Sequence, residues 1–84
     1  LSNLLKQNPQ LKVEISGHTD DVGSDSDNQS LSFKRANAVV EYLIKNGVNP
    51  QNIVAIGRGE SMPIAQNNNE ANRALNRRIE MKIL

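Results

Sequence analysis

The stretch LKVEISGHTD, residues 11–20, decides how the rest of this sequence is interpreted. From Leu11 to Ile15 apolar residues alternate with polar ones, which predicts a strand with one buried face. The strand ends near Asp20, and the polar segment 21–30 that follows is predicted to be a long loop. Because ligands of α/β proteins often bind where a strand is followed by a loop, we expect Asp20 to be a binding residue.

A helical pattern lies on each side of this strand. Upstream, Leu1, Leu4 and Leu5 have helical spacing, and Asn8-Pro9 ends the pattern. Downstream, a second helix is predicted to end at Gly47, a residue suited to the left-handed conformation that often follows a helix. The apolar stripe of that second helix consists of Ala36, Val39, Val40, Leu43 and Ile44.

The C-terminal part of the chain is predicted to hold two strands separated by a short helix. The apolar run at residues 53–57 predicts a strand buried on both faces. Residues 71–75 indicate one or two helical turns, and residues 79–83 alternate as a closing strand. Strands that alternate with helices predict an α/β or α+β fold with helices packed on a sheet, and we take residues 1–84 as one domain.

Composition excludes several classes of function. The chain has 84 residues, a formal charge of +1 and 2% aromatic residues, so we expect neither a nucleic-acid partner nor a basic membrane-binding face. Cysteine is absent, which excludes disulfides, thiolate zinc sites and a cysteine nucleophile. No apolar run approaches the length of about 20 residues that a membrane helix needs.

The second helix carries cations where a helix ordinarily carries anions. We take Ser32 as its N-cap, which places Lys34 and Arg35 in the first turn, against the helix dipole. An arginine beside the free amides of a helix N-terminus would form an anion-binding pocket suited to a carboxylate or a phosphate. The alternative is that both cations lie in solvent, or that Arg35 pairs with an aspartate of the preceding loop.

Other kinds of site fit the sequence less well. The aspartates between residues 20 and 27 lack the spacing of a calcium-binding loop. His18 has no nucleophile or second histidine placed to complete a catalytic triad or a metal site, so we expect it to be a structural hydrogen-bonding residue. We therefore predict no catalytic residue, no metal ion and no cofactor.

Two arginines, Arg77 and Arg78, precede the closing strand. If the alternation of that strand extends to them, their side chains point to opposite faces. We expect one of them to face a packed or ligand-lined region and the other to lie in solvent.

An ordered series of short motifs resembles the OmpA-like peptidoglycan-binding domain. The first group is Gly17-His18-Thr19-Asp20, then Gly23, Asn28, Leu31-Ser32 and Arg35-Ala36. The second group is Gly57, Gly59-Glu60, Pro63-Ile64-Ala65 and Asn67, followed by Arg73-Ala74 and Asn76-Arg77-Arg78-Ile79. Each motif is weak alone, but together they cover nearly the whole chain in the order and spacing of the family.

The resemblance implies a fold, a ligand and a location. It implies an α+β domain, an α/β sandwich with a mixed sheet, that binds the peptide stem of peptidoglycan in the periplasm as part of an outer-membrane or cell-envelope protein. It also implies recognition of diaminopimelate, or a similar residue, as a free amino-acid group, with Asp20 taking the ammonium and Arg35 the carboxylate. The further positions that match the family's pocket are Thr19, Asn28, Leu31 and Arg77.

The chain departs from the family pattern in two places. Asn69 and Asn72 stand where the family usually has threonine and glycine, and we expect the turn to survive because asparagine tolerates left-handed geometry. The family's opening strand and the start of its first helix would precede Leu1. We therefore expect an N-terminally truncated domain in which one strand lacks its neighbour.

Two other functions are left open by the sequence. An assembly domain would keep this fold without binding the ligand, although the presence of both Asp20 and Arg35 argues against it. A cell-wall peptide hydrolase would need a nucleophile, a metal or a general base in a cleft, and only His18 is a candidate. We therefore expect a binding domain and not an enzyme.

Overall fold

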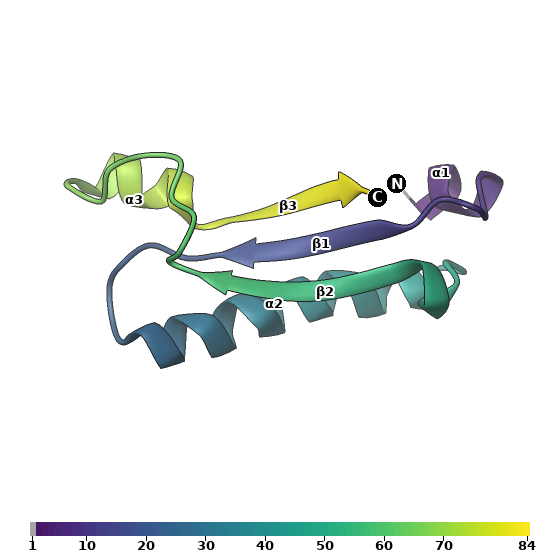
Figure 1. Cartoon of the computed structure of the whole chain (residues 1–84), viewed down its shortest axis with the longest axis horizontal. Coiled ribbons are helices and arrows are strands. Elements are labelled where there is room, and N and C mark those ends of the chain that lie inside the picture. The colour runs from purple at the N-terminus through teal and green to yellow at the C-terminus, as the bar shows by residue number, and fades with distance from the viewer. Residues whose placement is uncertain (1) are drawn as a thin grey trace.

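The computed structural model describes residues 2–84, and the predicted contribution of Leu1 to the first helix lies outside the described residues. In chain order the elements are α1 (Ser2–Gln7), β1 (Val13–His18), α2 (Asp25–Lys45), a 3₁₀ turn (Pro50–Asn52), β2 (Ile53–Gly59), α3 (Glu70–Asn76) and β3 (Arg78–Ile83) (Figure 1). The predicted order of helices and strands is confirmed. The start of α2 and the burial of β2 differ from the prediction.

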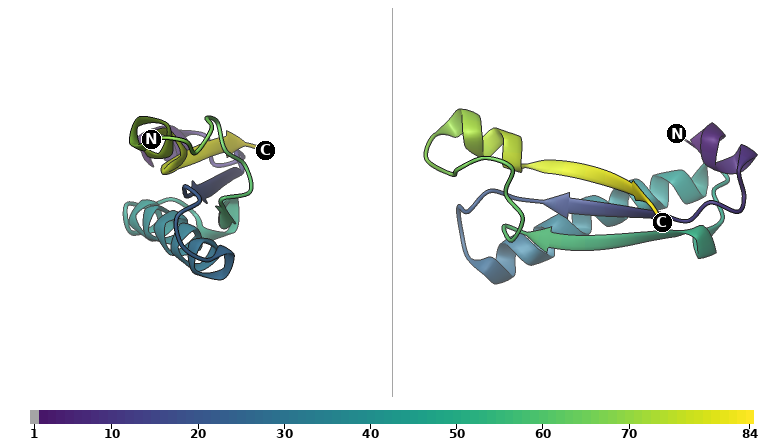
Figure 2. Two further views of the ribbon diagram at one scale, coloured as in Figure 1. Left: turned by 90° about the vertical axis from the view of Figure 1, so that its left-hand side faces the viewer. Right: turned by 45° about the horizontal axis from the view of Figure 1, so that its top comes forward.

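The three strands form one mixed sheet in the order β2-β1-β3 (Figure 1). β1 pairs in parallel with β2 and antiparallel with β3, so that Val13 lies opposite both Ile53 and Ile83. A parallel pair needs a crossover connection, and α2 supplies it. The end-on view in Figure 2 shows the helices on one side of the strands, which is the two-layer α+β arrangement predicted from the sequence.

The hydrophobic core lies between α2 and the adjoining face of β1 and β2. Two glycines allow the helix to approach the sheet closely. A Cβ atom on Gly17 would lie 2.1 Å from the carbonyl oxygen of Ser32, and one on Gly57 would lie 2.8 Å from the backbone nitrogen of Phe33. The buried apolar residues are Leu5, Val13, Ile15, Ala36, Val40, Leu43, Val48 and Ile53.

The helix α2 begins at Asp25, so segment 21–30 is not a loop throughout, as was predicted. Ser24 is the N-cap, and its hydroxyl oxygen accepts a hydrogen bond from the backbone N–H of Asp27 at 3.1 Å. Asp25 and Asp27 lie in the first turn, where carboxylates interact favourably with the helix dipole. Residues 25–27, 29 and 30 are exposed, and the buried position of this turn is the polar Asn28, which is why the composition resembles that of a loop.

Ser32, the predicted N-cap, lies inside α2 and is fully buried. Its hydroxyl donates to the carbonyl oxygen of Gln29 at 2.9 Å and accepts from the backbone N–H of Gly59 at 2.9 Å. The side chain therefore fastens the helix to the end of β2 and does not cap the helix. The prediction of a helix starting at Ser32 is wrong.

The C-terminal end of α2 follows the prediction. Gly47 has a φ of 101°, in the left-handed region. The backbone N–H of Val48 donates to the carbonyl of Leu43 and that of Gly47 to the carbonyl of Ile44, both at 3.0 Å. These two bonds form a Schellman motif, which satisfies carbonyl groups left free at the end of the helix.

The strand β2 is not buried on both faces, as its continuous apolar sequence had predicted. Val54 is 45% exposed, because the helices cover only one face of the sheet. β3 is also open, since α2 packs against β1 and β2 and leaves Ile79, Met81 and Ile83 at 41–49% exposure.

Candidate functional site

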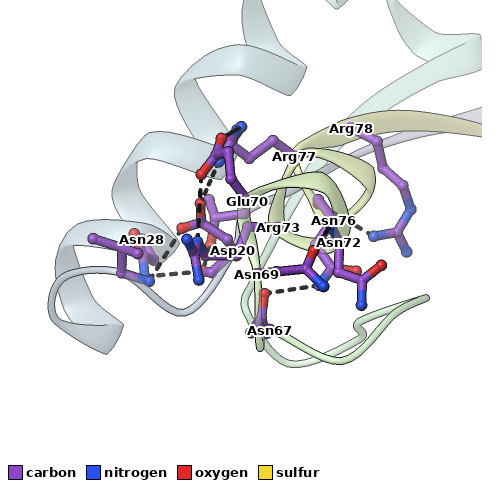
Figure 3. Close-up of polar contacts among 12 residues, drawn as sticks. Asp20, Asn28, Asn67, Asn69, Glu70, Asn72, Arg73, Asn76, Arg77 and Arg78 are labelled. Atoms are coloured by element: carbon purple, nitrogen blue, oxygen red, sulfur yellow. Dashed lines mark hydrogen bonds and ion pairs between the residues drawn. The ribbon is translucent and has the colours of Figure 1, made fainter.

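Three segments meet at one end of the molecule: the end of β1, the start of α2 and the junction of α3 with β3 (Figure 1). Asp20 follows β1, Asn28 lies in the first turn of α2, and Arg77 connects α3 to β3. Figure 3 shows the side chains of these three residues close together. Hydrogen bonds connect them with Thr19, so the structure brings together four of the residues predicted to line the pocket.

Asp20 is held at both its backbone and its carboxylate. Its carbonyl oxygen accepts hydrogen bonds from the Thr19 hydroxyl at 2.8 Å and from Nδ2 of Asn28 at 3.3 Å. Its Oδ1 accepts from the backbone N–H of Val22 at 3.1 Å. Thr19 is fixed in turn, because its N–H donates to the carbonyl of Gly59 at 2.9 Å. Thr19 and Asn28 therefore position Asp20 through its main chain.

Arg77 bridges two carboxylates. Its Nη1 donates to Oδ2 of Asp20 at 2.7 Å, and its Nη2 donates to Oε1 of Glu70 (Figure 3). Glu70 also approaches Arg73, with 3.4 Å between Oε2 and Nε. The side chain of Asp20 is 11% exposed and that of Glu70 is 67% exposed, so water shields the Asp20 contact far less than the Glu70 contact.

The surroundings keep the Asp20 carboxyl ionised. Burial by itself raises the pKa of Asp20, but the hydrogen bonds from Arg77 and the Val22 amide, with the charges of Arg77 and Arg73, bring it below its usual value. The pKa of Glu70 is also lowered, chiefly by its hydrogen bond from Arg77. Both groups therefore carry a negative charge at neutral pH.

Leu31 and Arg35 lie on the same flank of α2 as Asn28. At three and seven residues further along, their Cα atoms stand about 4.5 and 10.5 Å beyond that of Asn28 along the helix axis. Helical side chains generally lean toward the N-terminus of their helix, which is the end of α2 that carries Asn28. Leu31 is 41% exposed and Arg35 is exposed, and within residues 2–84 Arg35 has no ion-pair partner.

The predicted anion pocket at a helix N-terminus is not present around Arg35. Because α2 begins at Asp25, Lys34 and Arg35 lie about three turns inside the helix, away from its free amides. Both side chains are exposed, which agrees with the alternative interpretation that they lie in solvent. Arg77, and not Arg35, pairs with the aspartate that precedes the helix.

Arg78, the second arginine of the pair, is the less exposed of the two. Its side chain is 16% exposed and pairs with Glu80. Its Nη2 donates to the carbonyl of Met62 at 2.9 Å and its Nη1 to the carbonyl of Asn76 at 3.3 Å. Arg78 therefore fastens the segment after β2 to the start of β3.

His18 has the structural role expected of it. It is 3% exposed, and its Nε2 lies 3.1 Å from the Ser16 hydroxyl. Burial, helped by the positive charge of Arg78, lowers the pKa of His18, so the ring is neutral at pH 7. The imidazole is therefore a hydrogen-bonding group of the sheet.

Sequence reasoning missed the role of Glu70. The signal was available, because Glu70 precedes Arg77 by seven residues, which is two turns of a helix and places both on one face. The signal was also weak, because α3 is short and its first turn commonly carries an acidic residue for the dipole alone.

The comparisons with known proteins agree with this architecture. The sequence profile of the OmpA family matches residues 1–77. The chain belongs to the OmpA family. The predicted resemblance is thereby confirmed at the level of the family, whose homologues are structural, non-enzymatic proteins.

Individual OmpA-family relatives match along almost the whole chain. It is 48% identical over 83 residues to outer membrane porin F of Pseudomonas fluorescens and 40% identical over 83 residues to the peptidoglycan-binding protein ArfA of Mycobacterium bovis. Each match covers 99% of this chain and 26% of the relative, so the chain spans about a quarter of their length.

A solved structure in the family has the same fold. The crystal structure of the peptidoglycan-associated lipoprotein from Burkholderia pseudomallei superposes with a TM-score of 0.95 at 35% identity, covering 99% of this chain and 70% of that one. The α+β fold with a mixed sheet predicted from the sequence is therefore also the fold of a family member.

Proposed function

We propose that this chain is a non-enzymatic domain that binds peptidoglycan without forming a covalent bond. It does so through the diaminopimelate-type residue of the stem peptide, with Asp20 binding the ammonium group and Arg35 the carboxylate. The family to which the chain belongs, and its similarity to the peptidoglycan-binding protein ArfA, support peptidoglycan as the ligand. The similarity to outer membrane porin F supports a place in the cell envelope, and we assign the domain to the periplasm.

One observation carries the proposal. A well-held, ionised aspartate lies beside a helix flank on which an exposed arginine has no ion-pair partner among residues 2–84. A free amino-acid group carries an ammonium and a carboxylate on one carbon atom, so it can bridge such an aspartate and arginine. The carboxylate of the amino acid then gives Arg35 an ion-pair partner, while its ammonium group joins Arg77 at the Asp20 carboxylate.

The other residues of the proposed site have supporting roles. Thr19 and Asn28 hold the main chain of Asp20, and Arg77 holds its carboxylate from the side of β3. The half-exposed side chain of Leu31 lies between Asn28 and Arg35 along the helix and offers an apolar contact to the methylene chain of the ligand.

No membrane contact is assigned to the domain. Among residues 2–84 there is no helix with the length and apolar character needed to cross a bilayer. A single zwitterionic group also requires no charged surface, which is consistent with a formal charge of +1.

Amide NMR titration with meso-diaminopimelate tests the proposal, with lysine as the ligand control. We expect shifts at residues 19–35 and near Arg77 for diaminopimelate only. Arg35→Ala should weaken binding about tenfold or more, because a charged hydrogen bond to the ligand is lost. Lys34→Ala is the matched control, since Lys34 is the exposed cation next to Arg35.

Either of two results would refute the assignment. A folded wild-type chain that shows no shifts with diaminopimelate would favour an assembly role over ligand binding. Equal losses in Arg35→Ala and Lys34→Ala would show that the exposed cations of α2 act only through their overall charge.

A further inference from the structure

Glu70 shares the guanidinium of Arg77 with Asp20. The two carboxylates bind different nitrogens, since Nη1 donates to Asp20 and Nη2 to Glu70 (Figure 3). Arg73 approaches the second oxygen of Glu70 at 3.4 Å. Two cations and two anions thus form one connected group at the junction of α3 and β3.

This division of Arg77 leaves part of the Asp20 carboxylate open. An arginine can bind one carboxylate with two parallel N–H groups, and such a pair occupies both oxygens. Here Asp20 receives a single nitrogen of Arg77 on Oδ2, while Oδ1 accepts only the amide of Val22 among residues 2–84. Each carboxylate oxygen has two acceptor positions, so acceptor capacity is left for a ligand.

Glu70 also sets the charge around Asp20. The charges of Asp20, Glu70, Arg73 and Arg77 sum to zero, and without Glu70 the same group carries +1. Arg77 and Arg73 both act on Asp20 through their charge. A positive group around Asp20 repels an incoming ammonium.

We propose that Glu70 is a positioning residue that sets the affinity of this site for an ammonium group. It does so by holding Arg77 to a single contact with Asp20 and by neutralising the positive charge of Arg77. The inference rests on the function proposed above. It concerns a residue outside the motifs that carry the family resemblance, and it assigns to Glu70 no contact with the ligand.

A merely structural role for Glu70 makes different predictions. As an acidic residue in the first turn of α3, Glu70 can stabilise that helix through the dipole alone. In that case its neutralisation would loosen α3 and the Arg77 contact that follows it, which would raise the pKa of Asp20 or leave it unchanged. The carboxyl pKa of Asp20 therefore separates the two roles.

Glu70→Gln in the full chain provides the test, with Glu41→Gln as the matched control. Glu41 is an exposed glutamate far along α2, where it accepts a hydrogen bond from Asn37. Two quantities are measured by NMR: the pKa of the Asp20 carboxyl without ligand, and the affinity for meso-diaminopimelate at low and at physiological salt.

We expect Glu70→Gln to lower the pKa of Asp20 further, because Arg77 then acts on it without competition. Affinity should fall about two- to fivefold at low salt, the size expected for a partly exposed ion pair, and less at physiological salt. Glu41→Gln should leave both quantities unchanged.

An unchanged or raised Asp20 pKa in Glu70→Gln overturns the inference, whatever the ligand does. If the wild type binds diaminopimelate and Glu70→Gln binds it with equal affinity, the inference is also overturned, while the proposed function stays intact. A wild-type chain that ignores diaminopimelate overturns the proposed function itself, and with it the role of Glu70 in ammonium binding.

Discussion

Replacing Asn76 with alanine should destabilise the domain by about 2–4 kcal/mol. Asn76 is fully buried at the end of α3. Its Oδ1 accepts from the backbone N–H groups of Ile64 and Ala65 at 2.8 and 3.1 Å. Its Nδ2 donates to the carbonyl of Ala65 at 2.9 Å and to Oδ1 of Asn67 at 2.8 Å. One side chain therefore fastens residues 64–67 of the connection between β2 and α3.

The magnitude follows from these four bonds. Each contributes about 1 kcal/mol net, which gives about 4 kcal/mol if none is replaced. Water can reach part of the segment around Ile64, which is 60% exposed, so about 2 kcal/mol is the lower bound. Such a loss is a large share of the stability of a small domain, which is about 5–15 kcal/mol.

Urea unfolding followed by far-ultraviolet circular dichroism measures this loss. Asn68→Ala is the control, because the side chain of Asn68 is exposed and, among residues 2–84, hydrogen-bonds only with the side chains of Gln66 and Asn72. We expect the control to lie within about 0.5 kcal/mol of the wild type. A loss below about 1 kcal/mol for Asn76→Ala, with an unchanged denaturant slope, would refute the hydrogen-bond argument.

Two further predictions concern the helix–sheet contact and the acid stability. Gly17→Ala would place a methyl group 2.1 Å from the carbonyl oxygen of Ser32. We therefore expect this variant to lose the cooperative thermal unfolding transition. A melting temperature within about 4 °C of the wild type would contradict this expectation. The pKa of Asp20 is lower in the folded chain than in the unfolded chain. Its contribution to stability is therefore fully present above the ordinary aspartate pKa of about 3.9 and is lost as the pH falls through the folded value. Asp20→Asn should flatten the decline of the urea midpoint below about pH 4, and an acid dependence equal to that of the wild type would contradict the assignment.

Strands and helix ends that are marked by a pattern of neighbouring residues were predictable from the sequence. The alternation from Leu11 to Ile15 identified β1, and Gly47 identified the end of α2, because each pattern is a property of neighbouring residues. The start of α2 was also encoded locally, by Ser24 and Asp27, a serine followed three residues later by an acidic residue. It was missed because the buried positions of the first turns, Asn28 and Ser32, are polar, so these turns show no apolar stripe.

The candidate site was predictable only in part. Asp20 was indicated by its position after β1, and Asn28 and Arg77 by the ordered family motifs. The partner of Asp20 was not predictable, because Arg77 lies 57 residues away and reaches it only through the pairing of β3 with β1. The same is true of Ser32, whose position over Gly17 results from the packing of α2 on the sheet.

The sequence alone determined the order of the elements, the α+β class, the family and the aspartate at the end of the first strand. These follow from local periodicity, from capping residues and from motifs whose order is preserved along the chain. Only the tertiary structure decided which charges pair, which faces of β2 and β3 stay open, and where Arg35 lies relative to the helix N-terminus. Those properties depend on contacts between residues far apart in the chain, and such contacts form only when the helices and strands have packed.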